Sequence, residues 1–110
     1  MPIISDHYSY RVRWSAEDEE YLATVAEFPS LSWLAASSHE AFEGIQRLVV
    51  DVMGDMAHNH EELPVPLGVR VYSGNFMVRI PPEEHRQLAI EAAEQHVSLN
   101  RLVASRLAGE

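Results

Sequence analysis

The sequence contains no cysteine, no lysine and no long hydrophobic run. Without cysteine, disulfide bonds and thiolate metal sites are excluded. No apolar run approaches the roughly 20 residues that a membrane-spanning helix needs. Residues 1–6 do not show a basic segment followed by an apolar core, so no signal peptide is visible and we expect a cytoplasmic protein.

The amino-acid composition is that of a globular protein. Hydrophobic residues make up 46% of the 110 residues and charged residues 23%, which distinguishes the chain from a disordered one. A chain of this length forms one ordinary domain or two very small ones, and a small unit buries little apolar surface alone. Stabilisation by a second chain is therefore plausible on size alone.

The acidic charge is unevenly distributed. Residues 1–73 hold 4 Arg against 12 Asp plus Glu, a balance of −8, whereas residues 74–110 hold 4 Arg against 5 Glu, a balance of −1. The net charge of −9 thus belongs mainly to the N-terminal part and does not exclude nucleic-acid binding by the C-terminal part. Every basic residue is arginine, which suits bidentate contacts but also fits a compositional bias.

The N-terminal part reads as a small antiparallel sheet with one helix. Alternation predicts strands over residues 8–14 and 21–28, and a short third strand over 31–36. Ser37 is a helix N-cap with Glu40 three residues later, and the helix should continue to about His58. Its inner face is an apolar stripe at helical spacing, formed by Ala41, Ile45, Leu48, Val49, Val52 and Met56.

A connector follows this helix. Pro64 and Pro66 prevent residues 59–68 from being helical throughout, and a short strand is expected over 69–72. Gly74 interrupts the alternation and is the expected hinge. We therefore predict an α+β protein with an N-terminal domain at 1–68, a linker at 69–74 and a C-terminal domain at 75–110.

The C-terminal part begins with a strand that has an unusual outer face. Alternation places Phe76, Val78 and Ile80 on the inner face and Asn75, Met77 and Arg79 on the outer one. An amide, a thioether and a guanidinium in a row are suited to reading base edges in a DNA major groove. The alternative is an ordinary solvent-exposed edge strand.

Two short helices are predicted after this strand. Pro81 and Pro82 end the strand at Ile80 and start a helix that runs to about residues 95–97. Ser98 is the N-cap of the last helix. The inner faces of the two helices are apolar stripes, formed by Leu88, Ala89 and Ala92 in the first and by Leu99, Leu102, Val103 and Leu107 in the second.

The single C-terminal strand needs a partner for its backbone hydrogen bonds, and no second strand lies nearby in this part of the chain. We expect a two-fold dimer in which two such strands pair antiparallel above interlocked helices. Its apolar core would consist of Phe76, Val78, Ile80, Leu88 and Leu102. The sequence leaves open whether dimers associate further into tetramers.

This order of elements resembles the ribbon-helix-helix fold of Arc-type and MetJ-type repressors. Together with the N-terminal part, the chain is similar to the HicB family of antitoxins, in particular the longer members with a C-terminal ribbon-helix-helix domain. The residues that carry the likeness are Tyr10–Trp14, the acidic turn with Tyr21, residues 27–31, Ser37–Glu40, residues 63–66, residues 73–81 and residues 97–100.

The resemblance implies a function. The N-terminal domain would be a truncated ribonuclease-H-like unit that masks a HicA-type toxin, an mRNA-cleaving nuclease. The C-terminal dimer would bind operator DNA and repress its own operon. Asn75, Met77 and Arg79 would read bases. The backbone amides of Ser98, Leu99 and Asn100 would hold phosphate, which helix-end physics supports independently of the resemblance.

The sequence departs from the family pattern at two positions. Ser30 and His96 stand where glycine is common, and a positive φ at His96 would be strained but tolerable. Neither position lies in the predicted strand of residues 75–80. At Ser98 and Asn100, plain helix capping is compatible with phosphate binding.

Several other readings of the sequence stay open. We expect no enzyme activity, cofactor or metal, although two clusters invite such interpretations: His58, His60, Glu61 and Glu62 as metal ligands, and Asp6, Glu27, Asp51 and Asp55 as nuclease carboxylates. Trp33 is either ordinary packing or an exposed anchor for a partner. The alternative function is a solitary ribbon-helix-helix regulator without a toxin partner.

Overall fold

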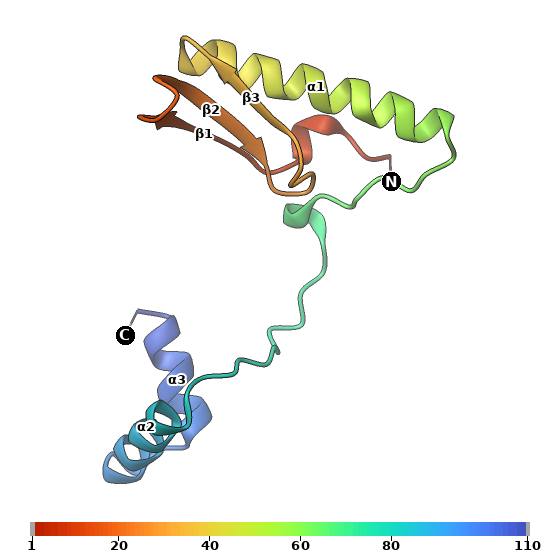
Figure 1. Ribbon diagram of the computed structural model, residues 1–110. Coiled ribbons are helices and arrows are strands. Elements are labelled where there is room, and N and C mark those ends of the chain that lie inside the picture. Colours follow the sequence, from red (N-terminus) through yellow and green to blue (C-terminus); the bar gives the residue numbers. More distant parts are fainter. Residues whose placement is uncertain (1, 110) are drawn as a thin grey trace. The chain divides into compact units, whose positions relative to one another are not determined.

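The structure is a computed structural model that describes residues 2–109. The chain divides into two compact units between Tyr72 and Ser73 (Figure 1). The N-terminal unit contains a three-stranded antiparallel sheet and the helix α1 (Ser38–His58). The C-terminal unit contains the helices α2 (Pro82–Glu94) and α3 (Leu99–Leu107). The α+β class predicted from the sequence is confirmed.

The three predicted strands of the N-terminal unit are present, each shorter than predicted, and the limits of the first two are shifted. They are β1 (Tyr10–Ser15), β2 (Glu20–Val25) and β3 (Ser32–Ala35), in the order β1-β2-β3. The first strand starts later than predicted because residues 5–7 form a 3-10 turn. The second ends at Val25 because Phe28 bonds back to it: the Phe28 N–H donates to the Val25 carbonyl at 3.2 Å.

Helix α1 begins as the capping pattern predicts. The Ser37 hydroxyl oxygen accepts the Glu40 N–H at 3.1 Å, and the same hydroxyl donates to the Glu40 carboxylate at 3.1 Å. Loss of such a cap typically costs about 1 kcal/mol. The helix ends at His58, and His60, two residues further on, adopts a positive φ of 58°.

The core of the N-terminal unit lies between the sheet and α1, which covers one face of the sheet (Figure 1). From α1, Ala41, Ile45 and Val49 are fully buried, as the apolar stripe predicts. Leu48, Val52 and Met56 are partly buried against them. From the sheet side, the buried core residues are Tyr8, Ala23, Val25 and Phe28.

The connector after α1 packs onto the N-terminal unit. The Tyr8 hydroxyl donates to the Pro64 carbonyl at 2.9 Å, and Pro66 is fully buried. The prediction of a strand at 69–72 is wrong. Val69 ends a 3-10 helix that begins at Leu67, and residues 70–72 form no strand. Val71 is fully exposed at 100%, and no strand among residues 2–109 pairs with this stretch.

The two C-terminal helices have the predicted limits. Pro82 occupies the first turn of α2, where its missing N–H costs nothing. Between the helices, His96 adopts a φ of 57°, so the predicted positive φ is confirmed. The Val97 N–H donates to the Ala92 carbonyl at 3.0 Å and the His96 N–H to the Ala93 carbonyl at 3.2 Å, which is a Schellman motif.

Candidate nucleic-acid interface

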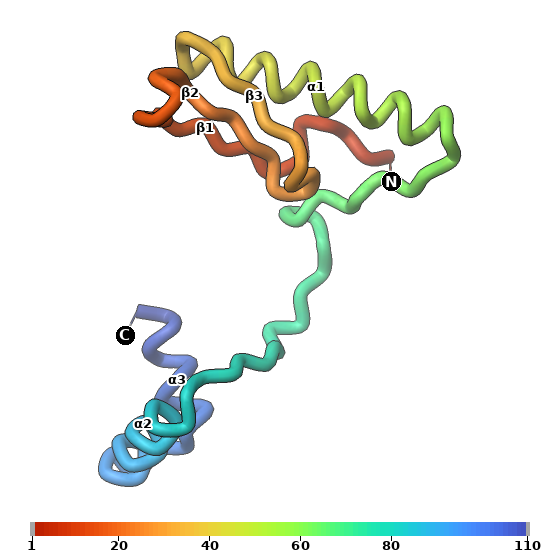
Figure 2. Tube along the Cα trace, in the orientation of Figure 1, coloured from red at the N-terminus to blue at the C-terminus, as the bar shows by residue number. Residues whose placement is uncertain are grey.

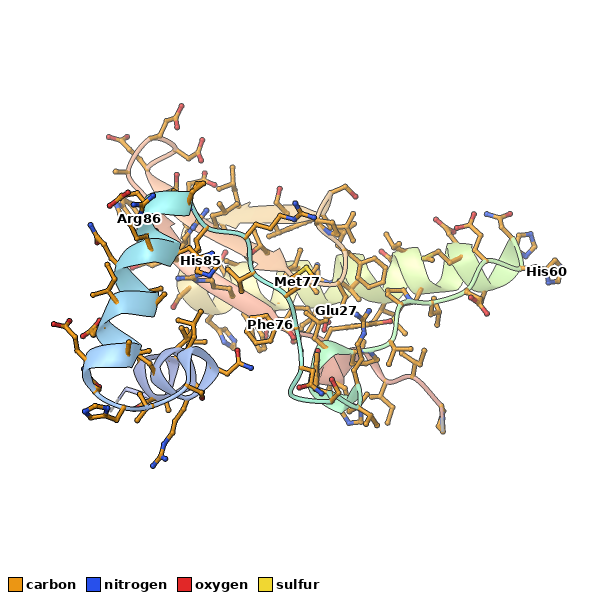
Figure 3. The ribbon with its side chains drawn as sticks, turned by 90° about the horizontal axis from the view of Figure 1, so that it is seen from below. Glu27, His60, Phe76, Met77, His85 and Arg86 are labelled. Carbon is orange, nitrogen blue, oxygen red and sulfur yellow. The ribbon has the colours of Figure 1, made fainter. Side chains whose placement is uncertain are left out.

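The segment of residues 75–80, which we call the ribbon segment, follows a tight turn. Gly74 has a φ of 86°, a conformation that favours glycine. Beside it, the Asn75 N–H donates to the Ser73 hydroxyl oxygen at 3.0 Å. The trace of the ribbon segment is free of helix, and Figure 3 shows the side chains of Phe76 and Met77 on it (Figures 2 and 3).

The predicted strand at the ribbon segment is not formed in the single chain. A strand requires a neighbouring backbone to accept and donate its hydrogen bonds, and none of the strands in residues 2–109 provides one. The strand was predicted to pair with the same strand of a second chain, so its absence in a single chain does not contradict that prediction. The pairing stays a prediction.

A groove of about 780 Å³ lies along the ribbon segment and the two helices of the C-terminal unit. Phe76, Val78 and Ile80 line it, whereas Met77 and Arg79 do not. The apolar residues that line the groove from α2 and α3 are Leu88, Leu99, Val103, Ala104 and Leu107. The three apolar residues of the ribbon segment therefore share the groove with apolar residues of both helices, and Asn75 lines its start.

The residues predicted as a dimer core differ in exposure within one chain. Leu102 is buried at 6%, and Leu88 is half-buried. Phe76 is 76% exposed, Val78 62% and Ile80 39%. Apolar side chains this exposed are costly in water, at about 25 cal/mol for each Å² left uncovered. The groove is an apolar surface that its own unit does not close.

The three residues predicted to read bases lie at the ribbon segment with different surroundings. Asn75 lines the start of the groove, while Met77 is 85% exposed. Arg79 is also exposed, and no ion pair within residues 2–109 involves it. Two of the three side chains thus lie outside the groove and are free to meet another molecule.

The predicted phosphate site lies at the start of α3. The Ser98 hydroxyl oxygen accepts the Arg101 N–H at 3.0 Å, so the predicted N-cap is confirmed. The N–H groups of Leu99 and Asn100 lie in the first turn of α3, where no carbonyl of the helix accepts them, and they carry the positive end of the helix dipole. Phosphate binding by these groups stays a prediction.

Arg101 is a candidate residue that the sequence reading missed. It lies in the first turn of α3, is exposed, and takes part in no ion pair among residues 2–109. By contrast, Arg86 pairs with Glu83 at 3.5 Å, and Arg106 pairs with Glu91. Arg101 directly follows the residues 98–100 predicted to hold phosphate, and that adjacency was the available signal.

Glu27, one of the carboxylates considered as a nuclease cluster, makes structural hydrogen bonds instead. Glu27 accepts the Ser9 N–H at 2.9 Å and the Leu67 N–H at 2.8 Å, and Figure 3 labels its side chain. Partial burial by itself raises the pKa of Glu27, but these N–H donors outweigh it and hold the pKa below its ordinary value. Glu27 therefore holds the connector against the sheet.

Neither metal interpretation gains support from the geometry. Among residues 2–109, no group of three or more His, Cys, Asp or Glu side chains is arranged to hold a metal ion. His60 instead lies just past the end of α1 with a positive φ, and Figure 3 shows it beyond that end of the helix. In the same part of the chain, no helix combines the length and apolar character that crossing a bilayer requires.

Comparison with known families points to the C-terminal half. Residues 59–107 match the model of the HicB family. The match covers a little less than half of the chain and runs from the end of α1 through the connector and the ribbon segment to the last residue of α3. No curated protein and no solved structure matches this chain.

Proposed function

We propose that this chain is the antitoxin of a type II toxin–antitoxin pair. Its N-terminal unit would neutralise a HicA-type mRNA-cleaving toxin, and its C-terminal unit would form a ribbon-helix-helix dimer that represses its own operon. The observation that carries the proposal is the arrangement of the ribbon segment, where Phe76, Val78 and Ile80 face an open apolar groove and Met77 and Arg79 do not. The HicB-family match over the same residues supports it.

A second copy of the chain would complete the C-terminal unit. Two ribbon segments paired antiparallel satisfy each other's backbone hydrogen bonds, which the single chain leaves without a strand partner. The same pairing brings Phe76, Val78 and Ile80 of both copies over the grooves and removes their apolar surface from water. Dimerisation thus stabilises the site as well as completing it.

The dimer would present its outer face to DNA. Met77 and Arg79 would appear twice on one surface, joined by Asn75 once strand pairing turns it out of the groove, and a two-stranded ribbon fits the major groove. Arg79 would bond guanine through two parallel N–H groups, and Asn75 would bond adenine. At the start of α3, the Leu99 and Asn100 amides with the Arg101 side chain would hold a phosphate and set the register.

The toxin-masking role rests on the charge of the N-terminal unit. Its balance of −8 over residues 1–73 is complementary to a basic RNA-cleaving protein. Complementary charge speeds and orients association. The near-neutral C-terminal residues are then left for the nucleic acid.

The dimer and its DNA binding are tested together with two matched variants. Val78→Asp places a charge in the groove, whereas Ile90→Asp places one on α2, where Ile90 is 53% exposed and does not line the groove. We expect light scattering to give a dimer for the wild type and Ile90→Asp, and a monomer for Val78→Asp. Gel shifts on the DNA upstream of the gene should follow the same order.

The outcomes separate the candidate functions. A wild-type monomer, or a Val78→Asp variant that still dimerises and binds DNA, contradicts the ribbon-helix-helix proposal. A dimer that binds its upstream DNA but does not bind the protein encoded by the adjacent reading frame indicates a solitary regulator. RNA cleavage by the purified protein with magnesium contradicts both.

A further inference from the structure

The two edges of the N-terminal sheet are protected to different degrees. Strands β1 and β3 form the edges, since the order is β1-β2-β3. Strand β1 carries the exposed Arg11 and Arg13, and charged side chains on an edge strand discourage another chain from pairing with it. Strand β3 has the sequence Ser-Trp-Leu-Ala, without charge or proline. The β3 edge thus lacks the charged side chains that discourage another strand from pairing with it.

Strand β3 exposes apolar side chains on both faces. Trp33 is paired with Ala23 and Leu34 with Leu22, so the two side chains point to opposite faces of the sheet. Trp33 is 39% exposed and Leu34 43%. The Trp33 ring packs against α1 at Gly44, so closely that a Cβ added at Gly44 would overlap it. Trp33 is therefore a positioned aromatic side chain on an open edge.

A groove of about 430 Å³ runs beside this edge. Strand β3 forms one side of it, and Glu40, Glu43 and Arg47 of α1 lie along the other. The acidic turn of residues 17–20 lies at the same end of the unit, because Tyr21 pairs with Ala35 just before α1 begins (Figure 1). The surroundings of the groove are thus predominantly acidic.

We propose that β3 is a docking edge to which a basic partner protein adds one strand of its own. The added strand would bond to the open backbone of β3, and its apolar side chains would cover Trp33 and Leu34. Its lysine or arginine side chains would reach Glu40 and Glu43. The inference rests on the proposed function, since it names the surface of the N-terminal unit that takes the toxin.

The charge pattern favours this occupant over a second copy of the chain. The ribbon segment is the candidate strand from a second copy, and its single charged residue is Arg79. The rest of the N-terminal unit is acidic and would repel its own copy at the same edge. A basic partner would be attracted both by Glu40 and Glu43 at the rim of the groove and by the acidic N-terminal unit as a whole.

The test uses the full-length chain and the purified protein encoded by the adjacent reading frame. Leu34→Lys adds a charge to β3 that should discourage strand pairing. Its matched control is Val50→Lys on α1, where Val50 is 52% exposed. Glu43→Lys reverses a rim charge, and Asp51→Lys makes the same change of net charge at an exposed α1 position outside the groove. Thermal unfolding followed by circular dichroism confirms that each variant is folded.

We expect Leu34→Lys to weaken binding by about tenfold or more, the effect of losing a buried interface anchor. Glu43→Lys should weaken binding severalfold at low salt and less at high salt, because salt screens exposed charges. Both controls should bind within about twofold of the wild type. In amide hydrogen exchange of the wild-type complex, β3 should gain protection.

Each contrary result has a distinct meaning. If the wild type binds the adjacent protein, and Leu34→Lys binds equally well or β3 gains no protection, the docking edge is wrong while the antitoxin function stands. If Leu34→Lys changes only self-association, a second copy covers the edge and the proposal is overturned. If the wild type does not bind the adjacent protein at all, the antitoxin function fails, and this inference fails with it.

Discussion

The carboxylate of Glu27 accepts a hydrogen bond from the backbone N–H of Leu67 at 2.8 Å, joining residues that are 40 positions apart. The same carboxylate accepts the Ser9 N–H and hydroxyl. One acidic side chain thus holds the start of β1 and the connector together. This contact lets the N-terminal unit extend past α1 to the 3-10 helix at Leu67–Val69.

Glu27→Gln should lower the free energy of unfolding by about 1–2 kcal/mol at neutral pH, the typical contribution of hydrogen bonds to a charged acceptor at a partly exposed site. Because the folded pKa lies below the ordinary value of 4.5, the carboxylate's contribution is complete above that value. It is lost as the pH falls through the folded pKa. Urea titrations from pH 7 to pH 3 should show the wild type and the variant converging.

Glu61→Gln serves as the control for Glu27→Gln, because Glu61 is an exposed carboxylate in the same connector. It should change the unfolding free energy by less than about 0.5 kcal/mol. A constant difference between the Glu27 variant and the wild type across the whole pH range would contradict the assigned role.

His96→Gly should raise the free energy of unfolding by about 0.5–1 kcal/mol, because glycine adopts a positive φ without the strain that a Cβ brings. His60 has nearly the same φ of 58° at the end of α1, so His60→Gly is the matched variant in the other unit. Thermal unfolding measures both. Destabilisation by either variant would mean that the histidine side chain contributes more than its backbone strain costs.

Gly44→Ala and Gly54→Ala should change the free energy of unfolding in opposite directions, although both glycines lie in α1. A Cβ at Gly54 meets nothing within 4 Å, so alanine should stabilise the helix by about 1 kcal/mol. At Gly44 the Cβ would lie 2.0 Å from Trp33 Nε1, so the indole must move. We expect lower stability and a change in tryptophan fluorescence for Gly44→Ala. Equal stabilisation by both variants would show that the Trp33 packing is not specific.

Arg79→Ala should weaken operator binding by roughly 1–3 kcal/mol and relax specificity at one base position. The control is Arg70→Ala, because Arg70 is an exposed arginine of the N-terminal unit and its removal changes the net charge equally. Gel shifts on the upstream DNA and on single-base variants of it measure both effects. Unchanged affinity in an Arg79→Ala variant that is still dimeric would contradict base reading by the ribbon segment.

The sequence was sufficient wherever short-range patterns determine the structure. The cap at Ser37, the buried stripe Ala41–Ile45–Val49, the cap at Ser98 and the positive φ at His96 all depend on residues within a few positions of one another. Their causes are helical periodicity and the end groups of helices, which act locally. The limits of α1, α2 and α3 could be predicted for the same reason.

Only the tertiary structure determined the conformation of the connector and the exposure of the β3 edge. The strand predicted at 69–72 is absent, because Tyr8, Glu27 and the burial of Pro66 hold the preceding residues in another conformation. The packing of Trp33 on Gly44 and the open edge beside it likewise depend on strand order and on the placement of α1. Such contacts join residues far apart in sequence, and no local pattern specifies them.

The ribbon segment lies between these two cases. Alternation in the sequence placed Phe76, Val78 and Ile80 on one face, and all three line the groove, whereas of the predicted outer face only Met77 and Arg79 lie outside it and Asn75 lines it. A single chain cannot form the strand itself, because backbone hydrogen bonds between strands need a partner. The sequence by itself grouped Phe76, Val78 and Ile80 on one face, whereas the structure placed Asn75 beside them and showed that the fold of one chain leaves the groove open.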